Sequence, residues 1–276
     1  MDIFLQQIVN GLVQGSIYAL VALGYTMVYG IMGLINFAHG EVVMIGTLVT
    51  ITVAGTLLKA GMPVALAGLA GLTAAVLVCM ALGWALERIA YRPLRNAPRL
   101  TPLITAIGMS IVLQNLAMMI WGRNYLTFPS LLPKVNFELA GAHFTAIQII
   151  IVLVSAATMG GLLLLVYRTK LGMAMRATAQ NPAVASLMGV NINRVIAAAF
   201  VIGSALGALA GVMVGTYYEI AHYQMGFMLG LKAFTAAVLG GIGNLGGAML
   251  GGMLLGLIEA LGAGYIGDIT GGILGS

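Results

Sequence analysis

The chain has 276 residues, of which 61% are hydrophobic and 7% are charged, and its formal net charge is +5. Soluble domains carry roughly a quarter charged residues, so this composition excludes an ordinary soluble protein and predicts a polytopic α-helical membrane protein. The basic residues lie in stretches that flank the apolar runs, a distribution that reports membrane orientation and gives no reason to expect nucleic-acid binding.

The first uncharged stretch, residues 3–40, is too long for one membrane span, which needs about 20 residues. We expect a first helix at about residues 8–29. The N-terminus lacks the positive region of a cleavable signal peptide, so this helix should stay in the membrane. Glycine and polar residues cluster in the sequence GIMGLINFAHGE, which predicts a break before a second helix that runs to about Leu58. A tight turn then leads into a third helix, at about residues 64–86.

The stretch after the third helix is strongly basic, with four arginines against the single acid Glu87. Further along, a loop of mixed charge at residues 122–145 and a short polar loop at residues 218–229 are expected outside the membrane. A half-helix at residues 230–239, too short to cross, is expected to break at the glycine-rich residues 240–247. The four arginines are Arg88, Arg92, Arg95 and Arg99, and the remaining expected spans are residues 102–121, 146–167, 195–217 and 247–266.

The positive-inside rule gives the orientation. With the N-terminus outside, the first, third and fifth helices run inward. The two basic stretches, one after the third helix and one at residues 168–194, then both lie in the cytoplasm.

Glycines recur every four residues in two of the predicted spans, at 203, 207, 211 and 215 and at 243, 247 and 251. This spacing leaves one helix face without side chains and allows close helix contacts. Packing within the subunit is the simpler interpretation, and a seam between subunits is the alternative.

Residues 168–194 form the longest polar interval, and they contain a short helix whose ends can be read from the sequence. Asn181 is a good N-cap, Pro182 suits the first helical position, and Gly189 suits the left-handed position after the helix. Ala183, Val184, Leu187 and Met188 would then share an apolar face, because their spacing is helical. This helix is either an ordinary cytoplasmic loop helix or a docking site for a cytoplasmic partner. Asn191 or Asn193 is expected to cap the next helix.

The sequence NFAHGE contains the densest polar cluster in an apolar context, with Asn36, His39 and Glu41. A broken helix inside a membrane is tolerated where protein or a water-filled cavity surrounds it, and such breaks commonly line substrate pathways. These three residues are therefore candidates for a translocation pathway. The alternative is a short cytoplasmic turn in which His39 and Glu41 face water.

Lys232 and the glycine-rich break are further pathway or gate candidates, with Gly241, Gly243 and Asn244 named in the break. Lys232 either extends to the membrane surface or pairs with Glu41 or Glu259.

No motif for catalysis or cofactor binding is found. The sequence GFMLGLKAF lacks the spacing and the Ser/Thr of a P-loop, so the chain is not expected to bind nucleotide itself. Its three histidines lie far apart and its one cysteine is isolated in an apolar run, so we expect no catalytic site, no metal site and no cofactor.

Four stretches closely resemble the LivH-type permease of bacterial branched-chain amino acid ABC importers. They are NGLVQGSIYALVALGYTMVYGIMGLINFAHGEVVMIG, ERIAYRPLR, LGMAMRATAQNPAVASLMGVNINRVIAAAFVIGSALGALAGV and FTAAVLGGIGNLGGAMLGG. The resemblance implies a multi-pass inner-membrane subunit that works with a LivM-type second permease, two cytoplasmic ATPases that bind the ATP, and a periplasmic amino-acid-binding protein. It also implies that residues 181–189 form a coupling helix that fits a cleft on the ATPase.

The resulting prediction is an all-α polytopic protein in a single permease domain, residues 1–276, with a cytoplasmic coupling segment at residues 168–194. About eight transmembrane or half-membrane helices are expected, with a broken-helix region and a short coupling helix. The alternatives are an importer permease for urea or short amides, an ion-coupled secondary transporter that uses Glu41, Lys232 and Glu259, and a passive channel.

Overall fold

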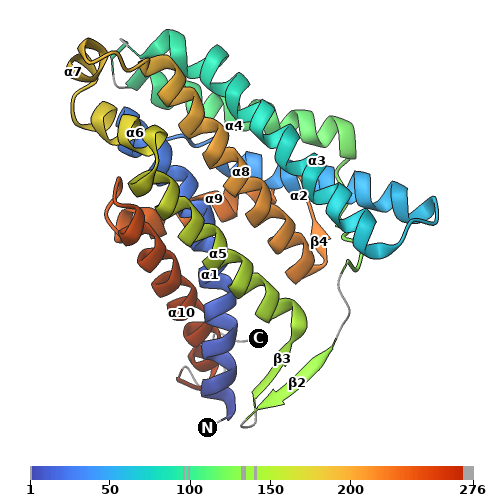
Figure 1. Ribbon diagram of the computed structural model, residues 1–276. Helices are drawn as coiled ribbons and strands as arrows, with labels where there is room; N and C mark the ends of the chain where they lie inside the picture. Colours follow the sequence, from blue (N-terminus) through green and yellow to red (C-terminus); the bar gives the residue numbers. More distant parts are fainter. Residues whose placement is uncertain (1, 96, 99, 132–134, 140–141, 270–276) are drawn as a thin grey trace.

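A computed structural model describes residues 2–269, apart from residues 96, 99, 132–134 and 140–141, and so leaves Arg99 outside the described residues. In chain order the elements are α1 (Asp2–Met32), α2 (His39–Lys59), α3 (Val64–Ala85), the π-helix η1 (Leu86–Tyr91), the 3-10 helix η2 (Arg92–Leu94), α4 (Leu100–Trp121), β1 (Leu126–Thr127), β2 (Asn136–Leu139), β3 (Ala142–Thr145), α5 (Ala146–Arg168), α6 (Lys170–Gln180), α7 (Pro182–Leu187), α8 (Ile192–Tyr218), β4 (Ile220–Ala221), α9 (Met225–Leu239) and α10 (Leu245–Ile269) (Figure 1).

Seven helical stretches in the described part of the chain are long and apolar enough to cross a membrane: α1, α2, α3 with its extension, α4, α5, α8 and α10. The chain is therefore an all-α multi-pass membrane protein, as the composition predicts. Helix α9 has 15 residues, or about 22 Å of helix, which is shorter than the roughly 30 Å hydrocarbon core.

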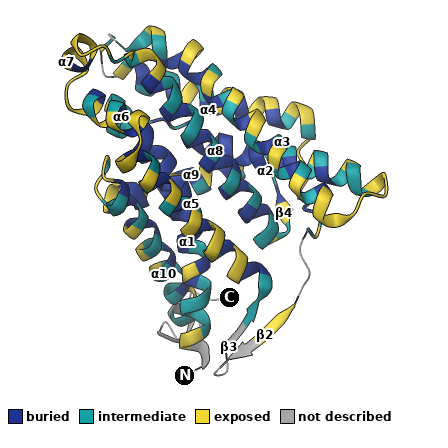
Figure 2. Cartoon of the chain, viewed as in Figure 1, coloured by how far each residue is buried: buried dark blue, intermediate teal, exposed yellow. Residues whose placement is uncertain are grey.

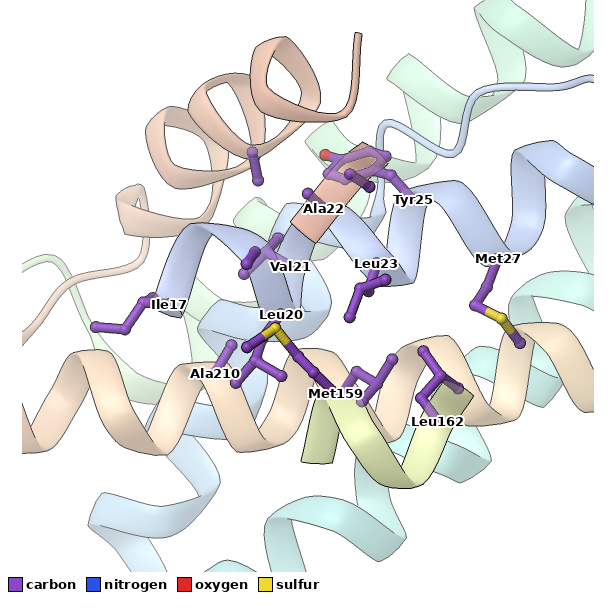
Figure 3. Close-up of a cluster of buried hydrophobic side chains, with 14 of the residues drawn as sticks. Ile17, Leu20, Val21, Ala22, Leu23, Tyr25, Met27, Met159, Leu162 and Ala210 are labelled. Carbon is purple, nitrogen blue, oxygen red and sulfur yellow. The ribbon is translucent and has the colours of Figure 1, made fainter. Parts of the chain in front are cut away.

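The helices form an inner and an outer group. Helices α1, α2 and α8 are mostly buried in the molecule, whereas α3, α4 and α5 turn a large apolar surface outward (Figure 2). Near the centre of α1, Leu20 approaches Met159 of α5 and Ala210 of α8, so three elements distant in sequence close one core (Figure 3). The apolar outer faces are those that a lipid environment would cover.

The glycine faces serve packing within the chain. A Cβ on Gly256 would lie 2.2 Å from the backbone nitrogen of Gly15, and one on Gly211 would lie 2.3 Å from the carbonyl oxygen of Val43. These helices approach so closely because a side chain is missing at each crossing. The simpler interpretation of the glycine spacing is thus confirmed.

Helix α9 carries the chain back toward the end of the molecule where α8 begins. Helix α1 runs antiparallel to α10, since Gly11 meets Leu257 and Gly15 meets Met253. It also runs antiparallel to α8, since Gly24 meets Gly203 and Gln14 meets Tyr218. Helices α8 and α10 are therefore parallel, and α9 carries the chain from the end of one to the start of the other. The start of α1 and the end of α10 lie at one end of the molecule, with α7 at the opposite end (Figure 1).

Two expectations about the loops and breaks are wrong. The half-helix starts at Met225 instead of residue 230, so part of the expected loop at residues 218–229 is helical, and the break at residues 240–247 shortens to residues 240–244. The basic stretch after the third helix stays helical through η1 and η2 as far as Leu94. The loop at residues 122–145 has the expected bounds, and within it β2 and β3 pair as an antiparallel hairpin. Strand β1, earlier in the same loop, pairs with β4.

Two helix starts also differ from expectation. Helix α6 was not expected, although it buries Met175 and begins at an N-cap where Thr169 Oγ1 accepts a hydrogen bond from the Gly172 amide at 3.1 Å. Helix α1 begins six residues earlier than the expected residue 8 and ends at Met32. Both differences reflect packing against other helices, which periodicity within one segment does not report.

Candidate functional site

Helix α7 has the ends that its sequence predicts. Asn181 Oδ1 accepts a hydrogen bond from the Val184 amide at 3.1 Å, Pro182 is the first helical residue, and Gly189 has a φ of +85°. The helix ends at Leu187, one residue earlier than expected, and Met188 is its C-cap. All the determinants of this helix are local.

The apolar residues of α7 point away from the protein. The exposed fractions are 86% for Leu187, 80% for Met188 and 53% for Val184, whereas Ala185 is buried against the molecule. We call the three exposed residues the α7 tip. The tip lies at the far end of the molecule from the chain termini (Figure 2). Exposed apolar side chains gathered on a polar segment are typical of an interaction surface.

The two basic stretches of the sequence meet beneath α7. Asn191 Oδ1 accepts a hydrogen bond from the Arg194 amide at 3.1 Å and so caps α8. Arg95 donates to Asn193 Oδ1 at 2.6 Å and also forms an ion pair with the buried Glu87. Burial lowers the pKa of the Arg95 guanidinium and the Glu87 carboxylate opposes that shift, so the arginine stays charged at neutral pH. The end of η2 is thereby tied to the start of α8.

The connection between α1 and α2 is buried. Helix α1 ends one residue before Gly33, whose φ is +64°, and the next residues lead into the molecule. Asn36, His39 and Glu41 are 3%, 1% and 0% exposed. Tyr91 of η1 donates a hydrogen bond to Asn36 Oδ1 at 2.8 Å. A water-facing turn is therefore wrong for these residues, and the broken helix is enclosed by protein.

Within the described part of the chain, Glu41 is held without a cationic partner. Its Oε1 accepts hydrogen bonds from Ser110 Oγ at 3.0 Å and Gln114 Nε2 at 2.7 Å, both on α4. Among the described residues its Oε2 has no hydrogen-bond partner. A Cβ on Gly226, in the first turn of α9, would lie 2.8 Å from this oxygen. Glu41 is itself in the first turn of α2, so the positive ends of two helices favour its negative charge.

His39 fills a space left by two glycines. A Cβ on Gly24 would lie 2.1 Å from His39 Nε2, and one on Gly207 would lie 3.3 Å from the His39 ring. The ring packs edge to face on Tyr25, with centroids 4.9 Å apart. The geometry explains why glycines are needed where α1 and α8 approach the start of α2.

A cleft of about 520 Å³ opens beside the Glu41 site. Ser110 and Gln114 line it, and Gln224 adds a third polar group at the start of α9. Phe37 and Phe227 supply apolar wall. The two side chains that bond Glu41 therefore also face a hollow, which suits a path for a solute with both polar and apolar parts.

Lys232 lies away from the Glu41 site. It forms an ion pair with Glu259 of α10 and donates a hydrogen bond to Tyr18 at 3.4 Å, while Tyr18 donates to Glu259 Oε2 at 2.9 Å. Of the partners weighed from the sequence, Glu259 is the correct one and Glu41 is not. The lysine and glutamate side chains are 45% and 35% exposed, whereas Tyr18 is buried.

The turn between α9 and α10 contains the candidates from the glycine-rich break. Gly241 and Gly243 have φ values of +86° and +95°, and Asn244 Oδ1 accepts a hydrogen bond from the Gly247 amide at 3.2 Å, which caps α10. Gly243 lies against Gly30, near the end of α1. Gly241, Gly243 and Asn244 therefore have structural roles in this turn and helix cap. The structure does not bring them to the Glu41 site or to Lys232.

Comparison with known proteins gives the family. The family model described as "Branched-chain amino acid transport system / permease component" matches residues 7–274. The chain belongs to this family. It is 50% identical over 271 residues to the high-affinity branched-chain amino acid transport system permease protein BraD of Pseudomonas aeruginosa, covering 96% of this chain and 88% of that protein.

More distant relatives have related names. The corresponding permease protein LivH of Escherichia coli is 47% identical over 268 residues, covering 95% of this chain and 87% of its own length. A probable branched-chain amino acid transport permease protein LivH of Methanocaldococcus jannaschii is 26% identical over 264 residues, covering 91% and 79% of the two chains. No solved structure matches.

Several residues that shape the permease's polar sites escaped the sequence analysis. Ser110 and Gln114 lie four residues apart on α4, and this helical spacing is the one signal that they share a face. Tyr18 lies in an apolar run, where tyrosine is common, and Tyr91 lies in the basic stretch, so neither gave a signal.

Proposed function

We propose that this chain is the membrane permease subunit through which a bacterial ATP-binding-cassette importer moves branched-chain amino acids across the inner membrane. The observation that carries the proposal is 50% and 47% identity, over nearly the whole chain, to permeases whose names specify that substrate class. We place a second LivM-type permease, two cytoplasmic ATPases that bind ATP and a periplasmic amino-acid-binding protein around it.

In this mechanism α7 transmits the conformational change of the ATPase to the permease. The α7 tip would insert into the partner, and its rigid capping would pass the partner's motion to α6 and α8, which flank it in the chain. The Arg95–Asn193 hydrogen bond would carry the same motion to α3 through η1 and η2. The path would run beside the enclosed break, where Asn36, His39 and Glu41 lie.

The ion-coupled alternative loses its basis in geometry. It requires Glu41, Glu259 and Lys232 to act on one site, but Lys232 pairs with Glu259 and Glu41 is bonded by α4. An importer for urea or short amides would use the same kind of permease. The names of the relatives described above favour branched-chain amino acids over that substrate.

The test is purification from the native membrane followed by reconstitution. A tagged permease should bring one or two P-loop ATPases and a second permease, and the proteoliposomes should take up radiolabelled leucine or isoleucine, but not urea, when ATP and the binding protein are supplied. Recovery of a homo-oligomer without an ATPase, or uptake that an ionophore abolishes and ATP depletion does not, would refute the proposal.

A further inference from the structure

A second hollow, distinct from the cleft beside Glu41, lies where the end of α8, β4 and α9 meet the middle of α1. Its volume is about 260 Å³, slightly below the roughly 300–1,000 Å³ of pockets for drug-sized ligands. The size therefore suits a smaller ligand. We call it the α9 hollow, and its wall includes Tyr18, Val214, Tyr218, Met225, Leu229 and Lys232.

Two side chains of opposite charge lie at one wall of the α9 hollow. Tyr18 and Lys232 line it, and Glu259 is bonded to both of them. The three side chains come from α1, α9 and α10, so a cation, an anion and a buried hydroxyl meet where three helices converge. A further feature is that the lysine and glutamate remain partly exposed, at 45% and 35%. Lys232 faces the hollow, and Glu259 lies next to it through the ion pair.

The rest of the wall is largely apolar, although Tyr125, Tyr218 and His222 also line it. Val214 of α8 and Met225 and Leu229 of α9 present aliphatic and thioether groups next to the charged side chains. Methionine is flexible and polarisable, so it adapts to side chains of different branching. The hollow thus pairs a compact ionic end with an adaptable apolar surface.

We infer that the α9 hollow is a transit site for a zwitterionic amino acid with an aliphatic side chain. This inference rests on the proposed function and adds residues to it. The substrate carboxylate accepts hydrogen bonds from Lys232 Nζ and Tyr18 Oη, its ammonium donates to Glu259, and its aliphatic side chain lies on Val214, Met225 and Leu229.

Charge balance makes such a site workable in a membrane. The empty site contains one positive and one negative group that neutralise each other, so no unpaired charge is left in a medium where that is costly. A zwitterion adds one charge of each sign and exchanges one set of ion pairs for another. The net gain is small, and weak binding suits a transport step, because a solute must leave as readily as it enters.

A purely structural ion pair between α9 and α10 is the competing explanation, and a double variant separates the two. Lys232→Met with Glu259→Met removes both charges and keeps apolar contact between the helices. A structural pair tolerates this exchange, since well-packed apolar residues often replace an ion pair without loss of stability. A zwitterion site does not tolerate it, and uptake should fall at least tenfold although the thermal midpoint stays within a few degrees.

The direct test uses photo-leucine, a diazirine analogue of leucine, on the complex purified with its own partners and reconstituted in lipid. After illumination during ATP-driven uptake, mass spectrometry should find label within residues 214–232 or at Tyr18, and excess leucine should remove it. Labelling should fall at least tenfold in Lys232→Met and in Glu259→Gln. Lys59→Met, which removes an exposed lysine at the end of α2, is the matched control and should label normally.

The outcomes are distinct. Photo-leucine uptake with no label in this region, or wild-type uptake by the double methionine variant, would overturn the transit site and leave the proposed function standing. Failure of the wild-type complex to take up photo-leucine or leucine would overturn the proposed function, and this inference with it.

Discussion

Truncation of Leu187 tests the role of α7 most directly. This side chain is 86% exposed and makes almost no contribution to the fold of the permease itself. Burying a leucine side chain fully is worth about 1.5–3 kcal/mol, and about 1.4 kcal/mol corresponds to a tenfold change in affinity. If the α7 tip is buried in an ATPase cleft, Leu187→Ala should weaken ATPase binding roughly 10- to 100-fold. Leu187→Asp should weaken it further, because it also buries a charge.

The assay is binding of the purified ATPase to the detergent-solubilised permease, followed by leucine uptake per ATP hydrolysed in proteoliposomes. Leu187→Met keeps an apolar side chain of similar size and serves as the matched control, which should bind within a few-fold of wild type. All three variants should keep the thermal midpoint, since surface substitutions usually change stability by less than about 0.5 kcal/mol. Normal ATPase affinity and normal uptake in Leu187→Asp would refute the docking role.

Three other predictions follow from the structure. Gly256→Ala should destabilise the permease by about 1–3 kcal/mol, because the added methyl meets the backbone of α1. Gly160→Ala, where a Cβ meets open space, is the control and should be neutral or slightly stabilising. Equal thermal midpoints for the two variants would contradict the close crossing of α1 and α10. Glu41→Leu should be less stable than Glu41→Gln by about 2 kcal/mol, because Ser110 and Gln114 lose their acceptor, which thermal unfolding in detergent measures. Asn181→Ala should cost about 1 kcal/mol of helix stability and speed amide exchange in α7 about fivefold while α5 stays unchanged; identical exchange would show that the cap is dispensable.

The parts of this molecule that can be predicted from its sequence are those whose causes are local. The cap of α7 at Asn181, its proline and Gly189 all act within nine residues, so the helix can be placed to within one residue. The membrane spans follow from runs of apolar residues.

The remainder depends on partners that are distant in the chain. Glu41 is 69 residues from Ser110 and 73 from Gln114, so its burial without a cation cannot be inferred from the sequence around it. The choice of Glu259 over Glu41 as the partner of Lys232 depends on how α10 packs against α1 and α9. Helix continuation through η1 follows from burial of Glu87 and Tyr91 in the tertiary structure, where the basic composition indicated a loop.

The glycine crossing of α1 and α10 also determines when, during synthesis, α1 can pack against its main partner. Helix α1 packs along α10 more extensively than along any other described element, yet some 240 residues separate Gly15 from Gly256. At about 5–20 residues per second, the ribosome completes α10 roughly 10–50 s after α1. During that interval the bare glycine face of α1 has lipid or the insertion machinery as its neighbour. Helix α1 therefore enters the bilayer well before its main partner, and this contact waits until α10 has been made.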